Sequence, residues 1–290
     1  MDSRMTQQDK AQHFAAMHER DGCTLMPNAW DAGSARMLEA AGFEAILTTS
    51  AGIAFSLGLP DYGVASDAPR MTREAMLARV TEIASAVAVP VSADLEEGYG
   101  ATPADVAQTI SLAIDAGVVG ANLEDVGGDL SALFSVECAV DRICAARQAA
   151  VARGIPFVIN ARTDAFLIGR PDALKVSIAR CNQYRAAGAD CVFVPGVTDA
   201  QTLAVLVREI DAPLSVVMGL LPDSLSVPRL GELGVRRVST GGSLARKALA
   251  GLASAAQELK TSGTFTYAEG QLSTTHLNGI FAGAPGDPQA

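Results

Sequence analysis

The stretch "TPADVAQTISLAIDAG" (102–117), which runs directly into "GVVGANLED" (117–125), contains the two kinds of segment from which this chain is built. Its first part begins with a threonine suited to cap a helix, followed by Pro103 at the first helical position, and Gly117 marks the end. The second part is a short apolar run bounded by glycine and acidic residues, which is typical of a buried parallel strand. The stretch therefore predicts a helix followed by a strand.

The same alternation extends along most of the chain. Amphipathic segments such as "DAGSARMLEAAG" (31–42) separate short apolar runs, and several helices are predicted to end at a glycine that turns the chain into the next strand. Eight strand–helix units in about 235 residues predict a single (β/α)8 TIM barrel. A doubly wound open sheet is the alternative, and the count of eight and the lack of GxGxxG after the first strand disfavour it. The eight apolar runs are 24–29, 45–50, 90–96, 117–125, 156–162, 191–196, 213–219 and 235–242.

No linker divides the chain, so we expect one barrel domain over residues 1–260, with an extra helix in about the first 20 residues. Residues 261–290 are expected to form a C-terminal extension. Its last part, from about 278, is rich in glycine and proline and is predicted to be flexible.

Composition excludes several functional classes. The 290 residues carry 22 basic and 32 acidic side chains and no basic run, which argues against a nucleic-acid or anionic-membrane surface. No signal peptide and no run of about 20 apolar residues is present, and five scattered cysteines without CxxC pairing fit a reducing cytoplasm. Three histidines near the termini and four lysines in helix-like segments argue against a zinc site, a histidine triad and Schiff-base chemistry.

Polar side chains gather at the predicted carboxyl ends of successive strands, the edge where barrels carry their active sites. Strand alternation predicts that Asp94 and Glu96 lie on one side of their strand and Glu97 on the other. The strand-end residues are Asn28, Ser50, Asp94, Glu96, Glu124, Asp125, Asn160 and Arg162.

Carboxylates that converge at one barrel mouth repel each other, so protons or a divalent cation must compensate. Oxygen ligands without histidine or cysteine point to Mg²⁺ or Mn²⁺, and Arg162 offers a planar fork for a substrate carboxylate. A metal beside an arginine suits a 2-oxo acid whose oxygen becomes negative as an enolate develops. In the plainer alternative, strand-end acids such as Asp94 only cap loops, and we expect Glu97 and Asp125 to be supporting or solvated residues.

A glycine-rich segment, "STGGSLARKA" (239–248), follows the eighth predicted strand. Many barrels bind phosphate at such a turn before a helix. The alternative, which we favour, is a tight turn at Gly241 and Gly242 with Ser243 as the helix cap.

Five motifs together resemble the isocitrate lyase and phosphoenolpyruvate mutase superfamily, over roughly residues 24 to 255. The superfamily pattern D-x-D-x-G-[FY]-G reads "DLEEGYG" (94–100) here, with glutamate at the second acidic position. The other motifs are "NAWDAGSARMLEAAGFEAI" (28–46), "TTSAGIAFSLGLPD" (48–61), "ANLEDV" (121–126) and "INARTDAF" (159–166).

The resemblance implies a barrel whose last helix is exchanged between subunits, in homodimers or homotetramers. It implies that members act on 2-oxo or 2-hydroxy acids through an enolpyruvate-like intermediate. By motif, Asp94 would bind the metal and the substrate, Glu96 and Glu124 would hold metal-bound water, and Asp61 would extend that network. Arg162 would bind the substrate carboxylate, the backbone of Ser50, Ala51 and Gly52 would hold the oxo acid, and we expect Asn28 to contact the substrate.

Departures from the superfamily pattern narrow the activity. The lid stretch "VGGDLSALFSVE" (126–137) has neither the K-[KR]-C-G-H element of isocitrate and methylisocitrate lyases nor the Lys-Asn element of the mutases. The predicted function is therefore a Mg²⁺-dependent carbon–carbon lyase or decarboxylase, with Tyr99 or a water near Glu124 as the proton source. The alternatives are a C–P bond enzyme, a methylisocitrate-lyase-like enzyme, a barrel for phosphorylated substrates that uses "STGGS", and an oxo-acid-binding barrel without catalysis.

Overall fold

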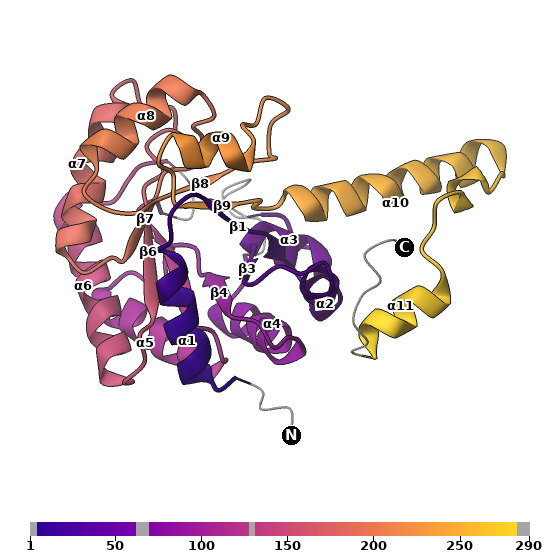
Figure 1. Cartoon of the computed structure of the whole chain (residues 1–290), viewed down its shortest axis with the longest axis horizontal. Coiled ribbons are helices and arrows are strands. Elements are labelled where there is room, and N and C mark those ends of the chain that lie inside the picture. The colour runs from indigo at the N-terminus through magenta and orange to yellow at the C-terminus, as the bar shows by residue number, and fades with distance from the viewer. Residues whose placement is uncertain (1–4, 62–69, 128–130, 283–290) are drawn as a thin grey trace.

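The computed structural model describes residues 5–61, 70–127 and 131–282. Its strands are all parallel and form a sheet in the order β1-β9-β8-β7-β6-β5-β4-β3-β2. The first predicted strand is split at Pro27: β1 (Thr24–Met26) pairs with the last strand and β2 (Asn28–Ala29) pairs with β3, so the sheet closes on itself (Figure 1). The predicted parallel barrel is confirmed, and the open-sheet alternative is wrong.

Each apolar run of the sequence contains a strand, and each strand is shorter than its run because the ends turn into loops. The remaining strands are β3 (Ile46–Thr48), β4 (Val91–Asp94), β5 (Gly120–Glu124), β6 (Val158–Arg162), β7 (Cys191–Phe193), β8 (Leu214–Val217) and β9 (Arg237–Ser239).

The helices begin where the sequence places caps. Asp31 caps the second helix through the Ser34 amide, and Thr102 caps the fifth helix, which has Pro103 in its first turn. The helices that surround the barrel are α2 (Ala32–Ala40), α3 (Ser50–Ser56), α4 (Arg73–Ala86), α5 (Pro103–Asp115), α6 (Val136–Ala152), α7 (Ala173–Ala186), α8 (Ala200–Glu209) and α9 (Val227–Glu232).

The predicted N-terminal helix, α1 (Gln7–Met17), is present and packs on the amino ends of the strands. Its Phe14 and Met17 are buried in a small apolar cluster with Leu47, Val119 and Val158. Burial of these side chains closes the end of the barrel opposite the predicted active site.

The segment after the last strand leaves the barrel. Helix α10 (Ser243–Ser262) projects away from it, and after a short 3-10 turn, η1 (Thr266–Ala268), helix α11 (Thr274–Phe281) returns to the side of α2 (Figure 1). Arg36 on α2 donates a hydrogen bond of 2.5 Å to the Phe281 carbonyl. Of the stretch predicted to be flexible, from about 278, the residues as far as Phe281 belong to α11, and residues 283–290 lie outside the described part.

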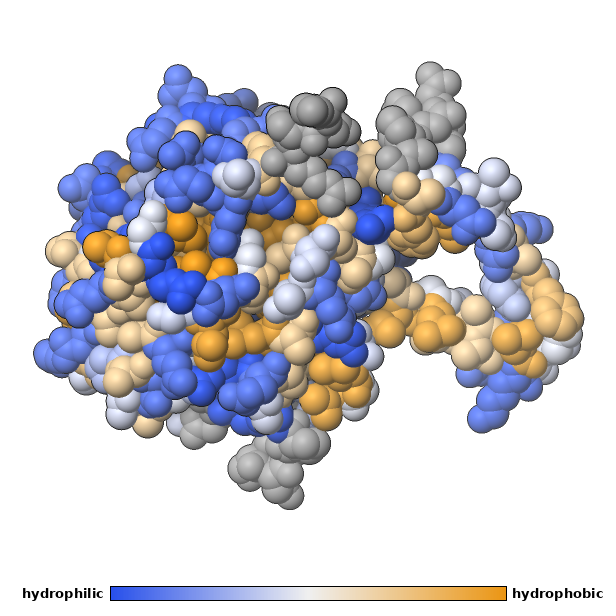
Figure 2. All heavy atoms as spheres, turned by 90° about the horizontal axis from the view of Figure 1, so that it is seen from below, coloured by the Kyte–Doolittle hydropathy of each residue, from blue (hydrophilic) through white to orange (hydrophobic). Residues whose placement is uncertain are grey.

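Apolar side chains lie exposed along this projecting segment. Leu252 and Phe265 each keep 67 % of their surface in solvent, and Figure 2 shows hydrophobic residues along the arm. Large apolar side chains exposed together commonly mark an interaction surface. Within the described residues, no helix combines the length and apolarity needed to cross a membrane, and all five cysteines are free thiols.

Candidate active site

A cavity of about 320 Å³ opens among the carboxyl ends of the strands, where the barrel rule places an active site. Its wall combines carboxylates, amides and arginines, of which Arg162 and Arg237 are largely buried, with an apolar side formed by Phe55, Leu167, Phe193, Pro195 and Leu220. Six of the predicted site residues line it: Asn28, Ser50, Ala51, Asp61, Asp94 and Arg162. Four others, Gly52, Glu96, Tyr99 and Glu124, do not line this cavity.

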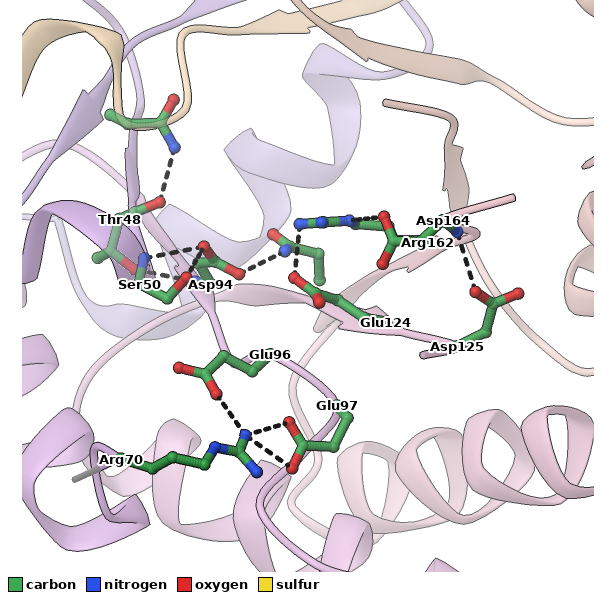
Figure 3. A network of polar contacts seen from close by, with 12 residues as sticks. Thr48, Ser50, Arg70, Asp94, Glu96, Glu97, Glu124, Asp125, Arg162 and Asp164 are labelled. Atoms are coloured by element: carbon green, nitrogen blue, oxygen red, sulfur yellow. Dashed lines mark hydrogen bonds and ion pairs between the residues drawn. The ribbon is translucent and has the colours of Figure 1, made fainter. Parts of the chain in front are cut away.

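Asp94, the last residue of β4, is held by neighbouring strands and the helix that begins at Ser50. One carboxylate oxygen accepts hydrogen bonds from the Ser50 amide (2.9 Å) and hydroxyl (2.8 Å), and the other accepts from Asn122 Nδ2 (2.8 Å). The Asp94 amide donates to Thr48 Oγ1 at 2.9 Å. Three donors therefore fix the carboxylate in one orientation at the cavity wall (Figure 3).

Arg162, at the end of β6, is held between two carboxylates. Its Nη1 lies 2.5 Å from Glu124 Oε1 and its Nε donates to Asp164 Oδ1 at 2.7 Å (Figure 3). Its guanidinium carbon lies 5.5 Å from the centre of the Phe193 ring, a cation–π distance. Burial alone would lower the pKa of Arg162, but Asp164 and Glu124 together raise it, so the arginine stays charged. Its side chain is 14 % exposed and faces the cavity.

A second layer of buried polar groups supports this arginine. Asp125 Oδ1 accepts a hydrogen bond from the Asp164 amide (3.0 Å), and its Oδ2 accepts from Arg180 (3.0 Å) and from the Tyr184 hydroxyl (2.6 Å). The expectation that Asp125 is a supporting residue fits these contacts. Sequence reasoning missed Asp164, although its position two residues after Arg162 in "INARTDAF" was a usable signal.

Glu96 corrects the prediction from strand alternation. Strand β4 ends at Asp94 and Glu96 has φ of 50°, in the left-handed region, so alternation does not continue to this residue. Glu96 and Glu97 both turn toward Arg70, whose Nη2 lies 3.2 Å and 3.3 Å from their carboxylates (Figure 3). The prediction that Glu97 points away from Glu96 is therefore wrong.

Glu96 and Tyr99 lie beside the cavity rather than in its wall. Burial, and then Glu97 and Asp94, raise the pKa of Glu96 to about 7. Tyr99, whose φ of 57° is also unusual for a side chain of this size, lines a separate hollow with Arg70 and Glu97.

Asn28 lines the cavity, but its side-chain amide is already hydrogen-bonded to backbone groups of the protein. Its Oδ1 accepts from the Thr240 amide (2.9 Å) and the Gly241 amide (2.8 Å), and its Nδ2 donates to the Thr48 carbonyl (2.6 Å). These bonds hold the loop after β9 against β3.

The prediction that Ser243 caps the helix after this loop is wrong. Helix α10 has Gly242 at its N-cap and Ser243 as its first residue.

The residues present fit a hard divalent cation. Asp94 and Asp61 both line the cavity, and burial together with the Asp94 charge raises the pKa of Asp61 to about 6. A cation between carboxylates removes this repulsion. Among the described residues, no group of three or more acidic, histidine or cysteine side chains is arranged to hold a metal ion by itself. Mg²⁺ in proteins is commonly bound by one or two carboxylates, and water and substrate oxygens complete its coordination shell.

Comparison with known proteins identifies the family. The family model for phosphoenolpyruvate phosphomutase matches residues 14–260, most of the chain. This protein belongs to the phosphoenolpyruvate mutase and isocitrate lyase superfamily. The superfamily includes lyases, decarboxylases and mutases that act on small oxo acids and are typically Mg²⁺-dependent.

Three relatives show how far the similarity extends. Oxaloacetate decarboxylase 1 of Pseudomonas fluorescens is 31 % identical over 241 residues, which cover 81 % of this chain and 79 % of that protein. A crystal structure from Burkholderia cenocepacia J2315, for which a lyase or mutase activity has been suggested, is 45 % identical with a TM-score of 0.90, covering 96 % of this chain and 99 % of that one. The structure of oxaloacetate acetylhydrolase in complex with the product oxalate is 26 % identical with a TM-score of 0.83, covering 94 % of both chains.

Proposed function

We propose that this protein is a Mg²⁺- or Mn²⁺-dependent lyase or decarboxylase that cleaves a carbon–carbon bond of a small 2-oxo or 2-hydroxy acid and leaves a pyruvate enolate. The observation that carries the proposal is the pairing of Asp94 and Arg162 in the wall of one cavity. A fixed carboxylate and a fixed guanidinium suit a metal and a substrate carboxylate, respectively.

The substrate carboxylate would bind the cavity face of Arg162, which Glu124 and Asp164 hold in place. Asp94 would hold the cation directly, and Asp61 would hold one of its water molecules. The bound cation would stabilise negative charge on the 2-oxo oxygen. The backbone at Ser50 and Ala51 lines the cavity beside Asp94 and would position the oxo acid.

Glu96 and Glu124 lie behind this wall, paired with Arg70 and Arg162. We therefore assign them to orienting the arginines and the water molecules of the site, without direct contact to the metal. Phe193 and Leu220 on the apolar side would surround the cleaved fragment and exclude water from the enolate.

The relatives favour oxaloacetate as the first substrate to test. Two of the three proteins compared above carry this acid in their names, as a decarboxylase and as an acetylhydrolase. A C–P bond enzyme or a methylisocitrate-lyase-like enzyme is the second candidate, supported by the phosphoenolpyruvate phosphomutase family model. The sequence of the lid stretch at 126–137, of which residues 128–130 lie outside the described part, disfavours both.

We further infer that the active form is a homodimer or homotetramer in which α10 packs on a second subunit. The support is that Leu249, Leu252 and Leu259 lie exposed along a helix that leaves its own barrel. Burying these leucines against a neighbour would remove a surface that is costly in water.

The test is substrate consumption and pyruvate release by the purified full-length protein with Mg²⁺, both measured against enzyme-free blanks. The substrates are oxaloacetate, 4-hydroxy-2-oxoglutarate, 2-methylisocitrate and phosphonopyruvate. Release from either of the first two supports the proposal, and turnover of phosphonopyruvate or 2-methylisocitrate alone supports the second candidate. Stabilisation by Mg²⁺ and oxalate with no turnover of any substrate would instead identify an oxo-acid-binding barrel without catalysis.

A further inference from the structure

A buried arginine lies at the inner end of the same cavity, on the side of the barrel that α1 closes. Arg237, the first residue of β9, is 1 % exposed and is among the residues that line the cavity. Its guanidinium carbon lies 5.8 Å from the centre of the Phe14 ring on α1. The cavity therefore extends from Asp94 and Arg162 down into the barrel.

The protein supplies this arginine with almost no acceptors. Its Nη1 lies 3.4 Å from His18 Nε2, and its Nε has no hydrogen-bond partner. Among the described residues, no carboxylate oxygen lies within 4.0 Å of the guanidinium. His18 adds no negative charge: its Nδ1 donates to the Phe14 carbonyl at 2.9 Å, so Nε2 of the neutral ring is only an acceptor.

A buried guanidinium in this state is expensive. Arginine keeps its proton in proteins, so burial cannot be relieved by loss of the charge. An ion without a partner in the protein interior costs several kcal/mol even after the surroundings relax. One or two neutral water molecules offset only part of the cost of burying this charge, whereas an opposite charge offsets it directly.

Neighbouring side chains provide further donors at the same place. Ser215 pairs in register with Arg237 on the adjacent strand, is 1 % exposed, and its hydroxyl has no partner. Asn160 is equally buried and lines the cavity, and its side-chain oxygen has no partner. A half-turn of this side-chain amide exchanges its oxygen and its NH2 group, which places a donor at the unpartnered position. A guanidinium, a hydroxyl and an amide are the donors with which proteins bind small anions.

We propose that Arg237, with Ser215 and Asn160, binds a small monovalent inorganic anion of the chloride class inside the barrel, beneath the oxo-acid site. The volume permits this, because about 320 Å³ corresponds to roughly ten water volumes, enough for a small acid and an ion together. The bound anion neutralises Arg237 and stabilises the closed end of the barrel.

Bromide is the probe, because it has the charge of chloride and scatters anomalously. Crystals of the full-length protein grown in sodium bromide, without any oxo acid, should show an anomalous peak within hydrogen-bond distance of Arg237 Nε. In parallel, thermal unfolding is followed as bromide replaces gluconate at constant sodium concentration. A tenfold excess of bromide over its Kd should raise the midpoint by about 2–5 °C for a domain of this size.

Two variants separate this site from general salt effects. Arg237→Met should lose the midpoint shift. Arg246→Met, which removes an exposed arginine at the mouth of the same cavity, should keep the shift seen in the wild-type protein. If Arg237→Met does not fold, the crystal experiment on the wild-type protein still shows whether an anion binds at Arg237.

A crystal with only water at Arg237 Nε, or an equal bromide shift in wild type and Arg237→Met, would overturn the proposal. So would an anomalous peak at molar bromide without any midpoint shift at about 0.1 M, near physiological ionic strength. None of these readouts depends on turnover, so the result is independent of the proposed lyase activity.

Discussion

Replacing Arg162 with lysine tests how the site holds a substrate carboxylate. The guanidinium contacts Glu124 at 2.5 Å and Asp164 at 2.7 Å and still faces the cavity. A lysine ammonium is a compact charge on a flexible stem and cannot reproduce this fork. If the substrate loses one charge-assisted hydrogen bond, the cost is about 1.5–3 kcal/mol, or roughly 10- to 150-fold in affinity.

The assay is calorimetric titration of oxalate into the protein saturated with Mg²⁺, accompanied by urea unfolding. Arg162→Lys should bind oxalate roughly 10- to 150-fold more weakly and lose about 1–3 kcal/mol of unfolding free energy, because Glu124 and Asp164 lose their shared partner. Arg246→Lys is the matched control: it lines the same cavity but is exposed, and its stability should stay within about 0.5 kcal/mol of wild type. Oxalate affinity within twofold of wild type in Arg162→Lys would refute this role.

Three other predictions concern packing, pH and assembly. A methyl group at Gly52 would lie 2.7 Å from Thr49 Cγ2, so Gly52→Ala should lose about 1–3 kcal/mol in urea unfolding. Gly251→Ala, on α10 with open space around it, should instead gain about 0.5–1 kcal/mol. Burial, and then the charge of Arg237, lower the pKa of His18 to about 4, so between pH 6.5 and 4 the unfolded chain binds more protons. The free energy of unfolding should therefore fall by about 3 kcal/mol as pH drops through this window. His18→Gln should lack this pH-dependent loss of stability. Leu252→Glu on the exposed face of α10 should reduce the molar mass measured by light scattering to that of a smaller assembly.

Each of these has a clear contrary result. Equal destabilisation by the two glycine substitutions would show that contact at Gly52 is not the cause. Parallel stability–pH curves for wild type and His18→Gln would remove His18 as the titrating group. An unchanged molar mass in Leu252→Glu would argue against assembly through α10.

The barrel was predictable because its signals are local. Helix caps such as Thr102, the glycine at 117 and the apolar runs each depend on neighbours in the chain, and eight such units leave few ways to bury the strands. The direction of α10 was not predictable in this way. Its periodicity shows that one face is apolar, but a pattern along one chain does not say whether its own barrel or another molecule covers that face.

The candidate site was predictable where strand ends alone decide position, as for Asp94 and Arg162. The parts of the site in which side chains from distant segments pair with one charged group were not predictable. Arg70, 26 residues before Glu96, pairs with the Glu96 carboxylate at 3.2 Å. Tyr184, 59 residues after Asp125, donates to its carboxylate, and no spacing rule at the sequence level joins these pairs.

The most direct test of the proposed function is the metal dependence of pyruvate release from oxaloacetate by wild type and by Asp94→Asn, corrected for the enzyme-free rate. Wild type should turn over with Mg²⁺, stop in excess EDTA and recover when Mg²⁺ is restored. Asp94→Asn keeps the size of the side chain and loses the charge, so it should be inactive and should bind Mg²⁺ more weakly. Full turnover in excess EDTA, or wild-type activity in Asp94→Asn, would contradict the proposed function.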